Sequence, residues 1–140
     1  ASYMVVAEDL NNSSLPYMPV FPAGQVIRAR AQYVDLPTIR GISYVTVYRQ
    51  DASPLISSDC WYTFQGLSTD GLVYVSAAFK LSPSMFPAEL DPNFDYEAFM
   101  ATFTDYMNGS IAQLNAATPD QFSPSLTTLD GMIQSFIVTG

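Results

Sequence analysis

The residues in this sequence best suited to chemistry are four acids within a short stretch, Glu89, Asp91, Asp95 and Glu97. Carboxylates are the ligands that Ca²⁺ prefers, and the ion takes about six to eight oxygens at regular spacing. The stretch lacks the glycine-containing acidic loop of an EF-hand. It also reads as the start of a helix, with Asp91 as N-cap and acids in the first turn favoured by the helix dipole. We keep the four acids as a weak calcium candidate and expect no metal site.

Other catalytic chemistry has little support in the sequence. The chain has no His, which removes the commonest general base and the commonest neutral metal ligand. Ser57-Ser58-Asp59 has no neighbouring His or Lys that could activate a hydroxyl. Paired carboxylates can hydrolyse glycosides, but an acidic chain offers such pairs by chance. We therefore expect a protein that is not an enzyme and that needs no cofactor.

The single cysteine, Cys60, excludes an intramolecular disulfide and a Cys-rich metal site. It stands next to Trp61 at the expected start of a strand. We expect a small buried apolar side chain. An intermolecular disulfide or lipid attachment stays open as the alternative.

Charge and composition exclude several classes of partner. The net charge is −8, with only five Lys and Arg residues, whereas nucleic acids and anionic membranes attract clustered bases. No stretch reaches the ~18 apolar residues that a membrane span needs. Scarce Lys and many Ser, Thr and Asn residues favour an extracytoplasmic protein, secreted or attached to the cell surface. Because the chain begins at Ala1 with a polar leader, we expect a mature chain from which a segment was removed.

Residues 1–24 are expected to form an extended, Pro-rich N-terminal arm. Pro cannot join central strands, and residues 11–24 carry three Pro residues. The arm also holds many large apolar side chains. We predict that it covers its own sheet or, as the alternative, adds a strand to a neighbouring subunit. Its expected partner-binding residues are Tyr3, Val5, Tyr17, Met18 and Phe21.

Residues 25–140 are expected to form a single α+β domain that starts with an antiparallel sheet of about four or more strands. Residues 26–34 alternate and residues 42–48 are β-branched and aromatic, as in strands. Residues 60–79 form a hairpin around a type I turn, Ser68–Gly71. The expected register places Trp61 opposite Phe79 and lays Tyr74 over Gly66. Both faces of this hairpin would then be apolar, with Tyr62, Phe64 and Tyr74 on one of them as partner-binding candidates. Core packing of these aromatics is the alternative, and we favour it over a binding surface.

Two C-terminal helices are expected to pack on the sheet. Apolar residues recur at helical spacing over residues 90–117, and Phe103 among them is expected to be deeply buried. A second helix is expected to begin with Ser123 as N-cap and Pro124 at its first position.

Three stretches carry a resemblance: "AQYVDLPTIRGISYVTVYRQ", "YTFQGLSTDGLVYVSAAF" and "FSPSLTTLDGMIQSF". Together they resemble a group of uncharacterised secreted or lipoprotein-type bacterial domains with a YTFQGLxxDGxYYVSA hairpin. The chain departs from that pattern at Leu72, where Lys or Arg is usual. The order of sheet and helices is distantly similar to the PsbP/Mog1-like fold, an analogy of fold alone. The resemblance implies export and a surface location, and it brings no catalytic residues.

The sequence leaves three candidate functions. The first is a non-catalytic structural or assembly subunit of a cell-surface or envelope complex, which acts by protein–protein contacts with a protein partner or with itself. The second is an extracellular saccharide- or lipid-binding module, suggested by the 14% aromatic content. The third is an enzyme that uses carboxylates alone. A pocket with convergent polar groups would favour the second, and an apolar patch or a projecting arm the first.

Overall fold

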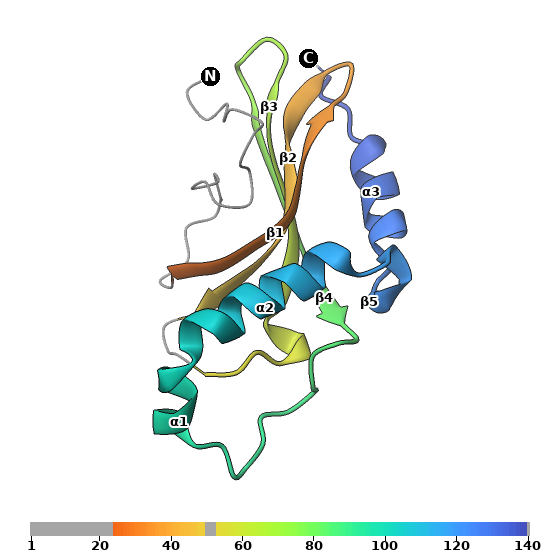
Figure 1. Cartoon of the computed structure of the whole chain (residues 1–140). Coiled ribbons are helices and arrows are strands. Elements are labelled where there is room, and N and C mark those ends of the chain that lie inside the picture. The colour runs from red at the N-terminus through yellow and green to blue at the C-terminus, as the bar shows by residue number, and fades with distance from the viewer. Residues whose placement is uncertain (1–23, 50–52, 140) are drawn as a thin grey trace.

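The computed structural model describes residues 24–49 and 53–139 and confirms the α+β class. Five strands form one curled antiparallel sheet in sequence order within these residues, and three α-helices accompany it (Figure 1). The strands are β1 (Gly24–Asp35), β2 (Ile39–Arg49), β3 (Cys60–Ser68), β4 (Tyr74–Pro83) and β5 (Phe122–Ser123). The helices are α1 (Tyr96–Ala101), α2 (Phe103–Ala116) and α3 (Leu126–Gln134). No described helix is long and apolar enough to cross a bilayer.

The hydrophobic core lies between one face of the sheet and the helices α2 and α3. Figure 1 shows α2 crossing the sheet near β1, with α3 standing beside its upper part. Val45, Tyr62 and Phe64 from the sheet meet Leu114 of α2 and Ile133 of α3 in this core. On the opposite face Ile42 and Tyr44 form a small second cluster with Ala31. These contacts make the helix-covered face the main source of hydrophobic stabilisation.

The register of the β3–β4 hairpin differs from the predicted one by one residue. Tyr62, not Trp61, lies opposite Phe79, and Val75, not Tyr74, lies opposite Gly66. The cause is a longer loop: the amide of Ser68 donates to the carbonyl of Val73 (2.8 Å), so four residues separate the paired positions. A shift by one residue exchanges the faces of a strand. Tyr62 and Phe64 therefore share the core face with Val75 and Phe79. The opposite face of the hairpin is mixed, with Thr63, Gln65 and Ser76 beside Trp61 and Tyr74.

Two glycines face each other where β2 and β3 approach most closely. Gly41 pairs with Gly66, and a Cβ at Gly41 would lie 2.3 Å from the carbonyl oxygen of Gln65. A Cβ at Gly66 would lie 2.6 Å from the ring of Phe64. The aromatic side chain that covers this bare spot is thus Phe64 on the same strand, and not Tyr74 from across the hairpin as predicted.

The helical segment after β4 starts later than predicted and is broken. Asp91 does not cap a helix; its carboxylate accepts from the amide of Asn93 (2.9 Å) in a turn. Asp95 is the N-cap of α1 and accepts from the amide of Ala98 (3.2 Å). The chain leaves helical geometry at Thr102, between α1 and α2. Phe103 is consequently half-buried against the ring of Phe99, which corrects its expected place deep in the core.

The last helix also begins later than predicted. Ser123 belongs to β5, which pairs with the end of β4. Ser125 is the N-cap of α3, and its hydroxyl accepts from the amide of Thr127 (3.3 Å). Beyond α3, the amide of Val138 donates to the Thr38 hydroxyl (3.1 Å). This contact ties the tail to the β1–β2 turn.

Substituting Gly71 tests the hairpin loop. Gly71 has φ +79°, and a Cβ there would meet nothing within 4 Å, so the penalty for a side chain comes from the backbone alone. We expect Gly71→Val to lower the free energy of unfolding by about 1–2 kcal/mol, because a β-branched residue resists positive φ. Gly71→Asn should cost clearly less, since Asn tolerates this region. Urea unfolding of the three proteins measures both differences, and equal losses for Val and Asn would contradict the assignment.

Candidate functional site

Arg30 connects a distortion of β1 to the end of α2. The pairing of β1 with β2 shifts register between Ala29 and Gln32. Arg30, inside this bulge, is the one non-glycine residue of the described chain with positive φ, at 54°. Its amide donates to the side chain of Asn115 (2.7 Å). Its Nη1 donates to the carbonyl oxygens of Leu114, Asn115 and Ala117, at 3.1, 3.2 and 2.8 Å.

This contact satisfies the end of a helix electrostatically. The last carbonyls of an α-helix have no partner within the helix and carry partial negative charge. The described part of α2 has no base in its last turn, so the guanidinium of Arg30 supplies the missing positive charge from the sheet. Positive φ in a non-glycine residue costs free energy and persists only where the surroundings hold it. Here four hydrogen bonds to α2 and Ala117 hold Arg30 in place.

A second connection joins β3 to α3. The hydroxyl of Tyr62 donates to Oδ1 of Asp130 (2.5 Å), and the side-chain amide of Gln32 lies at 3.5 Å from the same oxygen. Burial, together with the hydrogen bond to Asp130, raises the pKa of Tyr62 well above its usual range. The phenol therefore stays protonated and remains a donor to the carboxylate at any physiological pH.

A cavity of about 250 Å³ opens between these two connections. Its polar walls come from β1, β3, α2 and α3, and its apolar lining from Ala31, Val45 and Leu126. The polar side chains that converge on it are Arg30, Gln32, Tyr62, Asn115 and Asp130. Among them only Tyr62 is a candidate from the sequence, where it is expected to bind a protein partner. Arg30 and Gln32 lie on β1, whereas Asn115 and Asp130 lie more than eighty residues later, and no motif links them.

The end of the sheet that carries the β3–β4 loop presents a second surface feature. There the Ser68 hydroxyl donates to Asp70 (2.5 Å), and the Asp70 carboxylate accepts from the amide of Leu72 (3.0 Å). These two bonds, the one to Ser68 first, lower the pKa of Asp70. The amide of Val73 donates to the Ser68 hydroxyl (3.0 Å). The side chain of Leu72 nevertheless points away from the domain and is 84% exposed.

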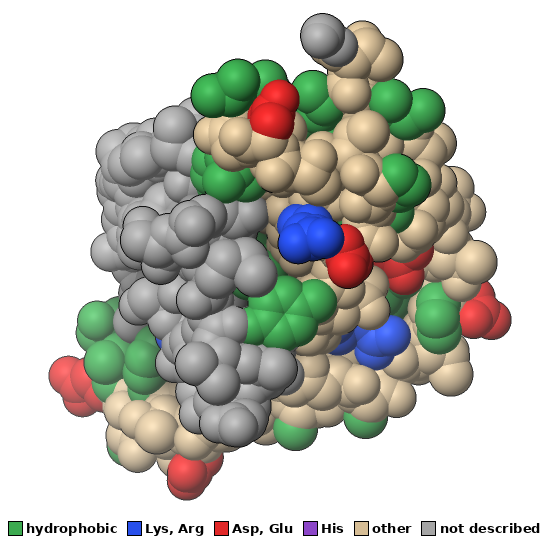
Figure 2. Space-filling model, turned by 90° about the horizontal axis from the view of Figure 1, so that it is seen from above, with side chains coloured by type: hydrophobic (Ala, Val, Ile, Leu, Met, Phe, Trp, Pro, Cys, Tyr) green, Lys and Arg blue, Asp and Glu red, His purple; other side chains and the backbone are tan. Residues whose placement is uncertain are grey.

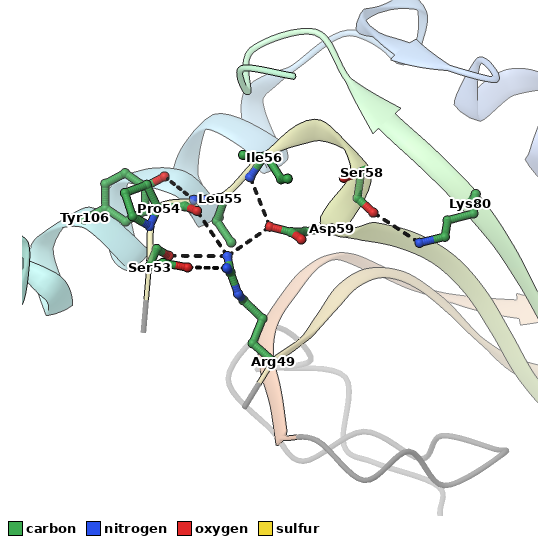
Figure 3. Close-up of polar contacts among 9 residues, drawn as sticks. All are labelled: Arg49, Ser53, Pro54, Leu55, Ile56, Ser58, Asp59, Lys80 and Tyr106. Carbon is green, nitrogen blue, oxygen red and sulfur yellow. Dashed lines mark hydrogen bonds and ion pairs between the residues drawn. The ribbon is translucent and has the colours of Figure 1, made fainter. Parts of the chain in front are cut away.

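A third polar cluster has a structural role (Figure 3). Nη1 of Arg49 lies 2.9 Å from Oδ2 of Asp59 and also donates to the carbonyl of Pro54 (3.1 Å). Asp59 accepts from the amide of Ile56 (3.0 Å), so both charges serve to fasten the segment before β3. Tyr106 of α2 accepts from the amide of Leu55 (2.8 Å) on the same segment. Asp59 is thus engaged with Arg49 and with the backbone of Ile56.

The structure places the residues of the calcium candidate and the single cysteine. The four acids of the calcium candidate, Glu89, Asp91, Asp95 and Glu97, do not converge, and no group of three potential metal ligands occurs within residues 24–49 and 53–139. Cys60 is fully buried in the core. Burial, and secondly the charge of Asp59, raises the pKa of its thiol to about 12. The buried thiol agrees with the apolar role and not with a bridge or a lipid anchor.

The predicted partner-binding residues divide into three groups. Tyr62 is 3% exposed and Phe64 fully buried, so both pack in the core, as in the alternative considered from the sequence, and their expected place on a binding surface is wrong. Tyr74 is 41% exposed, and its hydroxyl donates to Oε1 of Gln65 (2.8 Å). The remaining candidates lie outside the described residues: Tyr3, Val5, Tyr17, Met18 and Phe21.

Comparisons of the chain with protein-family models, with curated proteins and with solved structures found no match. The resemblance to secreted and lipoprotein-type domains therefore stays a prediction.

Removing the Tyr62 hydroxyl tests the connection between β3 and α3. Tyr62→Phe should lower the free energy of unfolding by about 1–2 kcal/mol at neutral pH, because Asp130 loses a buried donor. The folded-state pKa of Tyr62 lies above the unfolded value of about 10. The stability that the shift contributes is therefore complete below pH ~10 and is lost as pH rises further.

Urea unfolding of wild type and Tyr62→Phe between neutral pH and pH ~10.5 measures this difference. We expect the gap between the two proteins to narrow above pH ~10. Tyr96→Phe is the matched control, since Tyr96 is 56% exposed, and it should change stability little. A gap that stays constant through the alkaline range would contradict the assignment.

Proposed function

We propose that this chain is a non-catalytic structural or assembly subunit that acts by protein–protein contacts at one end of its sheet. This hairpin end comprises the β1–β2 turn, residues 36–38, the β3–β4 loop, residues 69–73, and the tail, residues 137–139. The amide of Thr69 donates to the carbonyl of Thr38 (2.9 Å), and Thr38 also binds the tail. The three segments therefore form one continuous surface.

The observation that carries the proposal is the exposure of Leu72 on a fixed loop. A leucine that is 84% exposed on a mobile loop would signify little, because single apolar residues are common on surfaces. Here Ser68 and Asp70 hold the loop by hydrogen bonds, so little conformational freedom is lost when a partner binds. Ile137, 72% exposed on the adjoining tail, adds a second apolar side chain. Figure 2 looks onto this end and shows apolar side chains among uncharged ones, with few bases.

The same end carries a hollow that can receive an apolar side chain. It has a volume of about 260 Å³ and is lined by Tyr33, Val34, Asp35, Arg40 and Gly41. An apolar projection and an apolar hollow on one end of a molecule suit a two-fold pair, in which each copy supplies both features. We infer that the partner is a second copy of this chain. The extracytoplasmic location belongs to the proposal and is supported by the low Lys content and the resemblance described above.

Replacing Leu72 tests the contact. We expect the wild-type chain to show a mass above its 15.4 kDa monomer by light scattering as concentration rises into the micromolar range. Leu72→Ser should shift the midpoint of association at least about tenfold toward higher concentration, because an apolar anchor at an interface centre contributes about 2 kcal/mol or more.

Leu90→Ser is the matched control, since Leu90 is 40% exposed and lies outside the hairpin end. It should associate like the wild type. A monomeric mass for the wild type at every concentration, or equal weakening by both substitutions, would refute the self-association proposal.

A further inference from the structure

We propose that the cavity between β1, β3, α2 and α3 is a binding site for a neutral polyhydroxyl ligand of the size of one monosaccharide. The proposal is independent of the assembly contact at the hairpin end, because the two surfaces share no residue. At about 250 Å³ the cavity lies just below the usual range of small-ligand pockets, about 300–1,000 Å³. It suits a single sugar ring rather than an oligosaccharide or a lipid chain.

The charges around the cavity favour an uncharged ligand. Arg30 and Asp130 both line it, so the site has no net formal charge. Moreover, the guanidinium of Arg30 is already bonded to three carbonyls at the negative end of α2, which compensates its charge. An anionic ligand would therefore meet the Asp130 carboxylate without a compensating positive potential.

The hydrogen-bonding groups match hydroxyls. A hydroxyl donates one hydrogen bond and accepts others, so it pairs best with a wall that offers both functions. Asp130 supplies acceptor oxygens, Arg30 supplies donors, and the amides of Gln32 and Asn115 supply both. Ala31, Val45 and Leu126 line the same cavity and can contact the C–H groups of a sugar ring. This combination of an apolar wall with a few convergent polar groups is typical of small-molecule sites.

The polar groups are positioned before any ligand arrives. Asn115 is fixed by the amide of Arg30 (2.7 Å) and Asp130 by the Tyr62 hydroxyl (2.5 Å). Each of these bonds uses one atom of the side chain, Oδ1 in both cases. Within the described residues, the hydrogen bonds of Asn115 and Asp130 fall on Oδ1, so Nδ2 of Asn115 and Oδ2 of Asp130 remain for a ligand. A site held by such supporting contacts loses little entropy on binding.

Titration of the ¹⁵N-labelled chain with D-glucose, D-galactose and N-acetylglucosamine, one at a time, tests the site by NMR. We expect at least one sugar to give saturable shifts at the side-chain amides of Gln32 and Asn115, with a dissociation constant in the millimolar range or below. Gln32→Ala should weaken that binding at least about threefold, since Gln32 is exposed and its removal spares the core. Gln113→Ala, an exposed glutamine on α2 outside the cavity, should bind like the wild type.

Three results would overturn the proposal. One is the absence of saturable shifts with all three sugars. Another is equal weakening by Gln32→Ala and Gln113→Ala, which would place binding elsewhere. The third is tighter binding of a zwitterion, probed with glycine, because Arg30 and Asp130 would then act as a charge pair for an amino acid. Thermal unfolding of both variants ensures that any loss of binding is measured on folded protein.

Discussion

The contact between Arg30 and the end of α2 is the constraint on which the architecture depends. The bulge in β1 turns the Arg30 backbone into positive φ, and its side chain then reaches three carbonyls around residues 114–117. This fixes where α2 ends relative to the sheet. The chain continues from there through β5 into α3, which brings Asp130 to Tyr62. The cavity between the helices and the sheet follows from the same two contacts.

Four of the five bases make contacts within the fold. Arg30 caps α2, and Arg49 fastens the segment before β3 through Asp59. Lys80 lies over the ring of Trp61 and binds the carbonyl of Ser58, while Arg40 pairs with Asp35 on the surface. These four basic side chains thus bind groups of the chain itself. Contacts with a partner or a ligand are therefore expected to come from apolar and uncharged polar groups. This agrees with an apolar contact at the hairpin end and a neutral ligand in the cavity.

Local patterns in the sequence predicted which segments form strands and helices. They did not predict the register of the hairpin, the first residues of the helices or the cavity. Alternation and β-branched residues indicated the strands, since these patterns reflect burial of one face. The predicted register of the β3–β4 hairpin was wrong by one residue because Leu72 belongs to the loop. The turn residues Ser68–Gly71 alone did not indicate this longer loop. Both helix starts were misplaced because several Asp and Ser residues compete as caps, and Asp95 and Ser125 prevail over Asp91 and Ser123. The cavity was missed because its residues come together only in the folded chain.

Hydrogen–deuterium exchange of the Arg30→Met variant tests the central constraint most directly. Methionine keeps the apolar stem but removes the side-chain donors to the carbonyls of Leu114, Asn115 and Ala117, while the backbone amide of residue 30 can still bind Asn115. We predict that the amides of the last turn of α2, residues 113–117, exchange at least about tenfold faster than in the wild type, because helix-end carbonyls lose a charged partner. Amides in the centre of β2 and β3 should be unchanged. Unaltered exchange at the end of α2, with Arg40→Met as the control, would contradict the account.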